Sequence, residues 1–376
     1  MSVINDPVQA TCPAPHAEHE RVLLGHGSGG QLSARLLHDV IVPGLGAAAA
    51  DLSLDDAAVL DLEPFIAPAD GSAGGGAGSE DLRSGSVVVT TDSFVVDPLE
   101  FPGGDIGALA VHGTVNDLAM RGAQPLALTV ALIVEEGFAL ADLRRLVASV
   151  GRAAARAGVP VVAGDTKVVG RGCADKLFIT TTGFGRRAPR ARCSATAIRP
   201  GDAILLSGPI GLHGVTVLAT REDLGFDADP QLRSDTRPLH RLVQAMLDAG
   251  GADVHALRDP TRGGLASALN ELAEASGVGI LVEEDAIPVP PVVAAACDLL
   301  GLDPLHVANE GCAVAFVHPA SADAVLAAIR SCPEGAEAVR IGTAVADNAG
   351  RVALHTLVGA YRIVDMLVGE QLPRIC

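Results

Sequence analysis

The sequence of 376 residues contains no tryptophan, a single tyrosine and 2% aromatic residues in all. Stacking platforms for single-stranded nucleic acids and for sugars depend on aromatic side chains, so the composition argues against both. Basic residues are also few: the sequence has 27 Lys and Arg against 45 Asp and Glu, which gives a net charge of −18. Because this charge repels a phosphate backbone, we expect no nucleic-acid partner, and a phosphorylated substrate would need bridging cations.

The seven cysteines are odd in number and form no C-x-x-C pair, so the sequence predicts neither a disulfide framework nor a zinc knuckle. The N-terminus lacks a basic segment followed by an apolar run, and no stretch reaches the roughly 20 apolar residues of a membrane helix. We therefore expect a protein of the reducing cytoplasm that has no membrane contact. Its hydrophobic content of 49% can supply a large core.

The chain length favours two domains, and shifts in composition indicate their limits. Residues 1–20 are polar and proline-rich and are expected to form a loose leader, followed by a first domain over residues 21–188. A basic, irregular segment then marks the boundary to a second domain over residues 189–362. Residues 363–376 are expected to form a flexible tail that carries Cys376.

Apolar spacing predicts helices over residues 105–122, with Gly122 directly after the last turn, and over residues 139–158. The apolar run at residues 125–134 predicts a strand of the fully buried type. Strands and helices alternate without a uniform βαβ rhythm, which favours an α/β fold of the α+β type with mixed sheets over a Rossmann domain. Further strands are expected near residues 86–92, 159–165, 176–185, 202–206, 277–285, 311–319, 339–346 and 351–357, and further helices near 238–249, 263–276 and 320–330.

A glycine-rich segment, Gly25–Gln31, precedes a helix-like run and contains Gly27, Ser28 and Gly29. Glycines let the backbone approach a ligand closely, and consecutive N–H groups can form an anion-binding nest. The alternative interpretation is a flexible turn before the helix.

Six aspartates stand beside small or apolar residues, several of them at predicted turns or strand ends. In so acidic a chain, each one taken alone fits a solvated surface position. As a set they match the oxygen ligands that Mg²⁺ takes together with nucleotide phosphates. The six are Asp55, Asp56, Asp92, Asp117, Asp165 and Asp259.

Three further segments carry charged groups at turns. Asp165–Lys167 follows an apolar strand and places a carboxylate, a hydroxyl and an ammonium together, which suits a phosphate as well as a plain surface turn. Arg262 beside Gly263 begins a helix and suits an anion. Glu310 precedes a strand and fits a general base, a metal ligand or an ordinary turn residue.

The sequence ends in Pro-Arg-Ile-Cys, and packing gives no reason for a cysteine at the last position. The ten steps from Met366 to Cys376 span at most about 33–36 Å when extended. We therefore expect a thiol that visits the active site of another protein and then returns to its own, with an accidental terminal cysteine as the alternative.

Together these segments resemble the HypE hydrogenase maturation factors, a family of carbamoyl dehydratases. The resemblance rests on GHGSGG, LDDAAVL, the block from Thr90 to Pro125, VAGDTKVV, LLSGPIGLHG, DPTRGGLA, NEG and the terminal PRIC. It runs from about residue 21 to the last residue, whereas residues 1–20 and the Gly/Ala-rich stretch at residues 67–86 look like additions.

The resemblance implies the two-domain fold of aminoimidazole ribonucleotide synthetase, selenophosphate synthetase and thiamine monophosphate kinase, with mixed sheets and helices on one face. It also implies a homodimer in which the N-terminal domains pair their sheets and bind ATP near that interface. By the same resemblance, the carbamoyltransferase HypF loads Cys376 with a carboxamide, and Mg-ATP drives its dehydration to a thiocyanate. The cyanide then passes to iron on a HypC–HypD scaffold, for the NiFe hydrogenase.

The resemblance also implies roles for single residues. It assigns Cys376 as the carrier, Glu310 as the base near the amide nitrogen and Lys167 as the group that stabilises the transferred phosphoryl. The implied Mg²⁺ ligands are Asp55, Asp56, Asp92, Asp117 and Asp259. The implied ATP-binding residues are Gly27, Ser28, Gly29, Asp92, Asn116, Asp117, Asp165, Thr166, Lys167, Arg262 and Gly263.

Two other functions fit parts of the same sequence. One is an ATP-dependent enzyme of the same superfamily that phosphorylates a small molecule, as selenophosphate synthetase or thiamine monophosphate kinase does. The other is a scaffold that binds nucleotide and partner proteins without catalysis. Removal of Cys376 separates the first from a tail-modifying enzyme, because an enzyme that phosphorylates a small molecule keeps its turnover without this residue. ATP consumption that depends on a carbamoylated tail would exclude the scaffold.

Overall fold

The computed structural model describes residues 30–36, 38–39, 57–60, 86–189, 191–222, 230–367, 369, 372 and 374–376. The predicted glycine-rich segment with Gly27, Ser28 and Gly29 lies outside the described residues, as do Asp55 and Asp56. The expected leader and the stretch at residues 67–86 lie outside them too, apart from Ser86. Among the helices that are described, none combines the length and the apolar character needed to cross a membrane.

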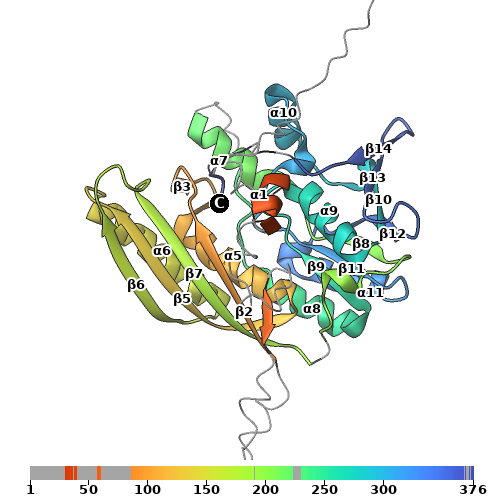
Figure 1. Cartoon of the computed structure of the whole chain (residues 1–376), viewed down its shortest axis with the longest axis horizontal. Helices are drawn as coiled ribbons and strands as arrows, with labels where there is room; N and C mark the ends of the chain where they lie inside the picture. Colours follow the sequence, from red (N-terminus) through yellow and green to blue (C-terminus); the bar gives the residue numbers. More distant parts are fainter. Residues whose placement is uncertain are drawn as a thin grey trace, which may run out of the picture.

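The first domain is built on a five-stranded sheet of strand order β1-β2-β7-β5-β6 (Figure 1). Strands β5 and β6 run parallel and the other neighbours antiparallel, so the sheet is mixed. The helices α5 and α6 cover one of its faces and leave the other open. The bounds are β1 Ala58–Leu60, β2 Val87–Phe94, α5 Ile106–Met120, β5 Ala123–Glu135, α6 Leu140–Ala157, β6 Val161–Val169 and β7 Leu177–Arg187.

Helix α5 is the central element of the molecule, buried along almost its whole length between the first sheet and the second domain. The Asp105 carboxylate caps its N-terminus by accepting a hydrogen bond from the Ala108 N–H at 2.9 Å. Gly122, with φ +67°, turns the chain away after its last turn. The helix lies so close to β2 that a Cβ on Gly113 would come 2.9 Å from the Phe94 ring.

The second domain contains a seven-stranded sheet of order β14-β13-β10-β12-β8-β11-β9, mixed because β10 and β13 run parallel. Along β8, Ile204 and Leu206 pack towards α9, whereas Ala203 and Leu205 pack towards α8 and α11. The bounds of the strands are β8 Ala203–Leu206, β9 Val254–Arg258, β10 Gly279–Glu283, β11 Val314–Val317, β12 Val339–Val345, β13 Val352–His355 and β14 Tyr361–Val364. The bounds of the helices are α7 Leu212–Glu222, α8 His240–Gly250, α9 Gly264–Ser276, α10 Pro291–Leu300 and α11 Ala322–Ser331.

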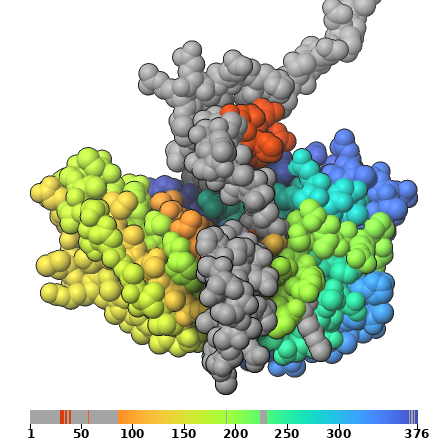
Figure 2. Space-filling view, turned by 60° about the horizontal axis from the view of Figure 1, so that its bottom comes forward, coloured from red at the N-terminus to blue at the C-terminus, as the bar shows by residue number. Residues whose placement is uncertain are grey.

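Short elements complete the fold, and the two domains stand side by side as the halves seen in Figure 2. In Figure 1 the C-terminus lies between the two halves, beside β3 and α7. The short elements are α1 Gln31–Leu36, β3 Glu100–Phe101, β4 Gly104–Asp105 and 3₁₀ turns at Ala195–Ala197, Gly251–Asp253, Glu284–Ala286, Pro304–His306 and Pro333–Gly335.

The predicted α/β fold with mixed sheets is confirmed, as are the helices expected at residues 105–122 and 139–158. The expectation of helices on one face holds for the first sheet only, because the apolar residues of β8 face helices on both sides. The strand predicted at residues 125–134 exists, but its fully buried character is wrong: nine of the thirteen residues of β5 are exposed or half-buried among the described residues. Strand β14 extends the second sheet to Val364, two residues into the expected tail.

Candidate active site

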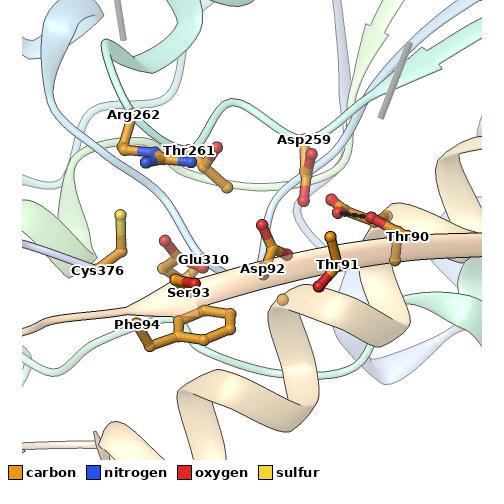
Figure 3. Close-up of a pocket in the computed structure, with 12 residues that line it drawn as sticks. Thr90, Thr91, Asp92, Ser93, Phe94, Asp259, Thr261, Arg262, Glu310 and Cys376 are labelled. Atoms are coloured by element: carbon orange, nitrogen blue, oxygen red, sulfur yellow. Dashed lines mark hydrogen bonds between the residues drawn. The ribbon is translucent and has the colours of Figure 1, made fainter. Parts of the chain in front are cut away.

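A cavity of about 230 Å³ lies where the two domains meet (Figure 3). Its walls come from four places in the chain: residues 90–94 of β2, one side of α5, the loop of residues 259–262 that leads into α9, and Glu310 before β11. Cys376, the last residue of the sequence, lines it as well. The fold thus collects groups that are up to 286 residues apart, from Thr90 to Cys376, around one space.

Strand β2 supplies the floor of the cavity with Thr90, Thr91, Asp92, Ser93 and Phe94, which Figure 3 shows along one ribbon. The alternation of the strand buries Thr90 and Phe94 and leaves the side chains between them more exposed. The Thr90 hydroxyl donates to the Asp117 carboxylate of α5 at 2.7 Å. This bond fixes the orientation of one carboxylate at the cavity wall.

Four carboxylates share the cavity: Asp92, Asp117, Asp259 and Glu310. Glu310 is only 3% exposed, and burial raises its pKa well above the ordinary 4.5, with the negative charges of Asp259, Asp235 and Asp92 acting in the same direction. The Arg262 charge opposes this shift without cancelling it. The cavity therefore has an excess of negative charge.

The backbone around Glu310 is held from the second domain. The Asp235 carboxylate accepts hydrogen bonds from the N–H groups of Glu310 and Gly311, both at 3.0 Å. From α5 of the first domain, the Asn116 amide donates to the carbonyl of Glu310 at 3.5 Å and to that of Arg237 at 3.1 Å. These bonds fix the main chain of Glu310 while its side chain points into the cavity.

Arg262 supplies positive charge to this cavity. The loop that carries it turns into α9 through Gly263 and Gly264, whose φ values of +75° and +63° disfavour any other residue. The pKa of the Arg262 guanidinium is raised, chiefly by Cys376 and then, against the effect of burial, by Asp92, Glu310 and Asp117. The guanidinium stays charged beside the Cys376 thiol, where it can bind an anionic or polarised group.

The oxygen-rich wall suits a hard cation such as Mg²⁺. The carboxylates of Asp92, Asp117 and Asp259 face one cavity. Burial is the largest cause of the raised pKa of Glu310, and the repulsion by neighbouring carboxylates that adds to it is what a cation would relieve. Within the described part of the chain, no three such side chains already stand together as a metal-ligand set. The donor set therefore fits Mg²⁺ in the manner that adds phosphate oxygens and water to one or two carboxylates.

The end of the chain is docked in the structure rather than extended away from it. The carbonyl of Arg374 accepts from the Asp97 N–H at 3.1 Å, and a main-chain oxygen of Cys376 accepts from the Val95 N–H at 3.2 Å. Ile375 is 3% exposed and belongs to the core of the first domain. The tail thus has, within one chain, a position in which its thiol faces the cavity.

Of the residues predicted for the site, the structure brings Asp92, Asp117, Asp259, Arg262, Glu310 and Cys376 to this cavity. Gly263 lies directly behind it, at the N-terminus of α9. Asn116 is buried but faces the joint between the domains, where its side chain accepts from the Leu239 N–H at 2.7 Å. Asp165, Thr166 and Lys167 lie elsewhere.

These three residues sit on β6, the exposed edge strand of the first sheet. Lys167 pairs with Asp165 at 3.1 Å, and the hydrogen bond from the Lys167 side chain lowers the pKa of Asp165. Since neighbouring strands lie about 4.8 Å apart, β6 is roughly 14 Å from β2 across β5 and β7. Within one chain, Lys167 therefore does not reach the cavity.

Several residues of the site were not predicted from the sequence. Thr90, Thr91, Ser93 and Thr261 add hydroxyl groups to the cavity. Their only signal is position, because they flank Asp92 and Arg262 in sequence. Asp235 gave no signal, since it stands in an irregular segment and acts on Glu310 only after folding.

Comparisons with known proteins were made on the whole chain. Residues 54–187 match the family described as AIR synthase related protein, N-terminal domain, and residues 199–355 match the corresponding C-terminal domain. The carbamoyl dehydratase HypE of Cupriavidus necator is 51% identical over 356 residues, which is 95% of this chain and 95% of that protein.

Two solved structures are similar over most of their length. A hydrogenase maturation protein HypE in complex with ATP shares 44% identity, covers 95% of this chain and 100% of its own, and superimposes with a TM-score of 0.74. A HypE–HypF complex contains a chain with 42% identity and a TM-score of 0.75, covering 87% of this chain and 100% of that one.

Proposed function

The chain belongs to the HypE family of carbamoyl dehydratases, and we propose that it dehydrates a carbamoyl group carried on its own Cys376. The observation that carries this proposal is the docked chain end, which brings the Cys376 thiol into a cavity with Glu310 and Arg262. ATP is the second substrate, as supported by the ATP complex of a relative that is 44% identical. The product on the cysteine is a thiocyanate.

The chemistry balances in two steps. The oxygen of S–C(=O)–NH₂ takes the γ-phosphoryl group of ATP while one N–H proton leaves, which gives S–C(=NH)–O–PO₃²⁻ and ADP. The C–O bond then breaks, phosphate leaves and the second N–H proton is removed, which gives S–C≡N. Oxygen is a poor leaving group until it is phosphorylated, so the first step makes the second possible.

Glu310 is the group that we assign to accept the protons. It is buried beside the docked thiol, and its raised pKa makes its carboxylate a stronger base than an ordinary glutamate. Arg262 lies where negative charge develops on the carbamoyl oxygen and on the transferred phosphoryl group. Mg²⁺ held by Asp92, Asp117 and Asp259 would neutralise the phosphates of ATP.

We propose that the working form is a homodimer joined at β6. This edge strand is exposed along its length, with Val162 at 61% and Val168 at 69%, and has no partner on its outer side among the described strands. An apolar groove of about 800 Å³ lies between β6 and α6. A strand edge and apolar groove of this kind favour pairing with a second copy.

A dimer at β6 also gives a role to Lys167. Lys167 is too far from the cavity of its own chain to bind a phosphate there. In the dimer, its ammonium would bind a phosphate in the cavity of the partner copy. The proposal of ATP binding near the interface therefore includes Asp165, Thr166 and Lys167 from one copy, together with the carboxylates of the other.

The partners follow from the same chemistry. A related chain has been solved as a HypE–HypF complex, and we propose that the carbamoyltransferase HypF loads Cys376 of this chain. A HypC–HypD scaffold then accepts the cyanide for its iron, in the cytoplasm. The tail therefore has to leave its docked position to be loaded, return for dehydration, and leave again.

The reaction is tested by ATP turnover of protein loaded by HypF. We expect one ATP to be consumed per loaded chain, no consumption with unloaded protein, and none with Cys376→Ala. Equal ATP turnover in Cys376→Ala would instead support an enzyme that phosphorylates a small molecule. Absence of turnover in every sample, with ATP still bound, would support a non-catalytic scaffold.

A further inference from the structure

A histidine of the second domain holds the docked end of the chain. His213, on α7, is completely buried. Its Nε2 lies 2.9 Å from the carbonyl oxygen of Ile375, and its Nδ1 lies 2.7 Å from the Ser234 hydroxyl. The Phe101 ring packs edge-on against the imidazole, with ring centres 5.4 Å apart. None of the steps proposed above uses this side chain.

The Ile375 carbonyl decides which nitrogen of His213 carries the proton, because a carbonyl oxygen can only accept a hydrogen bond. Nε2 therefore carries the hydrogen, and Nδ1 accepts from the Ser234 hydroxyl. The Ser234 oxygen in turn accepts from the Thr236 N–H at 3.1 Å, which suits its role as donor to Nδ1. Burial lowers the pKa of His213, against the smaller effects of Asp235 and the Ile375 carbonyl, which keeps the ring neutral.

The main chain is thus held on both sides of the reactive cysteine. His213 binds the carbonyl directly before Cys376, and the Val95 N–H binds a main-chain oxygen of Cys376 itself. With both sides fixed, the thiol keeps mainly the rotation about its Cα–Cβ bond. Figure 3 shows the sulfur of Cys376 pointing into the cavity, on the side of Arg262.

We propose that His213 is a positioning residue for the dehydration step, which it serves by binding the Ile375 carbonyl and placing the group on Cys376 against Glu310 and Arg262. This inference rests on the proposed function, because it assumes that Cys376 is the carrier. The proposal adds a requirement to the lining of the cavity, namely that the Ile375 carbonyl is bound by His213. The same bond has to break when the tail leaves to be loaded.

A variant of His213 that slows dehydration without slowing loading identifies this role. Loading needs the undocked tail and dehydration needs the docked one. The variant His213→Phe keeps the buried ring against Phe101 and removes the bond to Ile375. Loss of a buried hydrogen bond shifts such an equilibrium by about 5- to 10-fold.

The experiment uses the full-length protein and two measurements. In the unmodified protein, the rate of alkylation of each thiol by N-ethylmaleimide is followed by mass spectrometry, with the exposed Cys173 as internal reference. In His213→Phe we expect Cys376 to react about 5- to 10-fold faster and Cys173 to react unchanged. In protein loaded by HypF, single-turnover dehydration should slow by a similar factor, while loading does not slow.

The matched control is His306→Phe. His306 also binds a main-chain carbonyl near the start of the tail, that of Asp365 at 3.0 Å, but it lies outside the cavity. This variant should leave the alkylation of Cys376 unchanged. The variant His213→Gln, whose amide N–H can again donate to Ile375, should restore part of the protection.

Three results would overturn the proposal. They are unchanged alkylation of Cys376 in His213→Phe, an equal slowing of loading and dehydration, and an Nδ1–H tautomer of His213 in ¹⁵N NMR spectra of the native protein. The NMR measurement can refute the proposal even if the variants do not fold. Alkylation and NMR need neither ATP nor a carbamoyl group, so a native enzyme that fails to dehydrate would refute the proposed function without touching this test.

Discussion

The variant Ile375→Ala removes three buried carbons from the docked end of the chain. Ile375 is 3% exposed and packs in the core cluster of the first domain that includes Phe94, Val217 and Ala308. At about 0.8 kcal/mol for each buried carbon, the loss is about 2.4 kcal/mol, which weakens docking roughly 50-fold. The fold itself should be unaffected, because only the chain end leaves its place.

Two measurements test this estimate. Alkylation of Cys376 should accelerate towards the rate of a free thiol, and single-turnover dehydration should slow, while the melting temperature falls by no more than about 3 °C, the shift that a loss of this size produces in a chain of this length. The control is Ile363→Ala on β14, where the side chain is 48% exposed and little buried surface is lost. Acceleration of Cys376 alkylation by less than about threefold in Ile375→Ala would refute the reasoning, since it would mean that apolar burial does not hold the tail.

Three further predictions concern the cavity and the β6 edge. Glu310→Gln should slow dehydration by about 10²- to 10⁴-fold, because it removes the proposed base. The folded protein raises the pKa of this carboxyl, so its ionised form destabilises the fold. The variant should therefore stabilise the metal-free protein above the unfolded pKa of 4.5 but not below it, as measured by urea unfolding at several pH values. Val162→Asp should convert the proposed dimer to a monomer in sedimentation experiments. The control Leu357→Asp, at a 74% exposed position of the second domain, should leave the dimer intact. A native protein that sediments as a monomer would contradict the dimer. Gly113→Ala should destabilise the fold by about 1–3 kcal/mol, because its Cβ would press on the Phe94 ring at the cavity wall; an unchanged unfolding midpoint would show that the ring can yield.

Much of the fold could be predicted because its signals are local. The capping aspartate Asp105 and the terminal glycine Gly122 stand at the ends of α5, and both act within a few residues of their position in the sequence. The elements β9, β14, α7 and α10 were missed. Strand β14 is exposed at three of its four residues, and α7 follows a glycine-rich turn, so neither has a clear local apolar signal. Segments of this kind gain their structure from neighbours in the sheet or core, which the local pattern does not show.

The site residues differ in the same way: some are marked by local sequence, and others are placed only by the fold. Asp92, Asp259 and Glu310 occur in recognisable segments, and the fold brings them to one cavity. Lys167 occurs in an equally recognisable segment, but the sheet places it on an edge strand away from the cavity, and no local pattern shows the order of strands in a sheet. His213 acts through a contact 162 residues away in the chain, so only the folded structure shows it.

The most direct test of the central claim is mass spectrometry of the peptide that contains Cys376. The protein is loaded by HypF, freed of HypF and of the carbamoyl donor, and divided into samples with and without Mg-ATP. We predict that the peptide gains the mass of one carbamoyl group on Cys376 and then loses the mass of one water only in the sample with Mg-ATP. An unmodified Cys376, or a carbamoyl group that stays intact while ATP is consumed, would contradict the account.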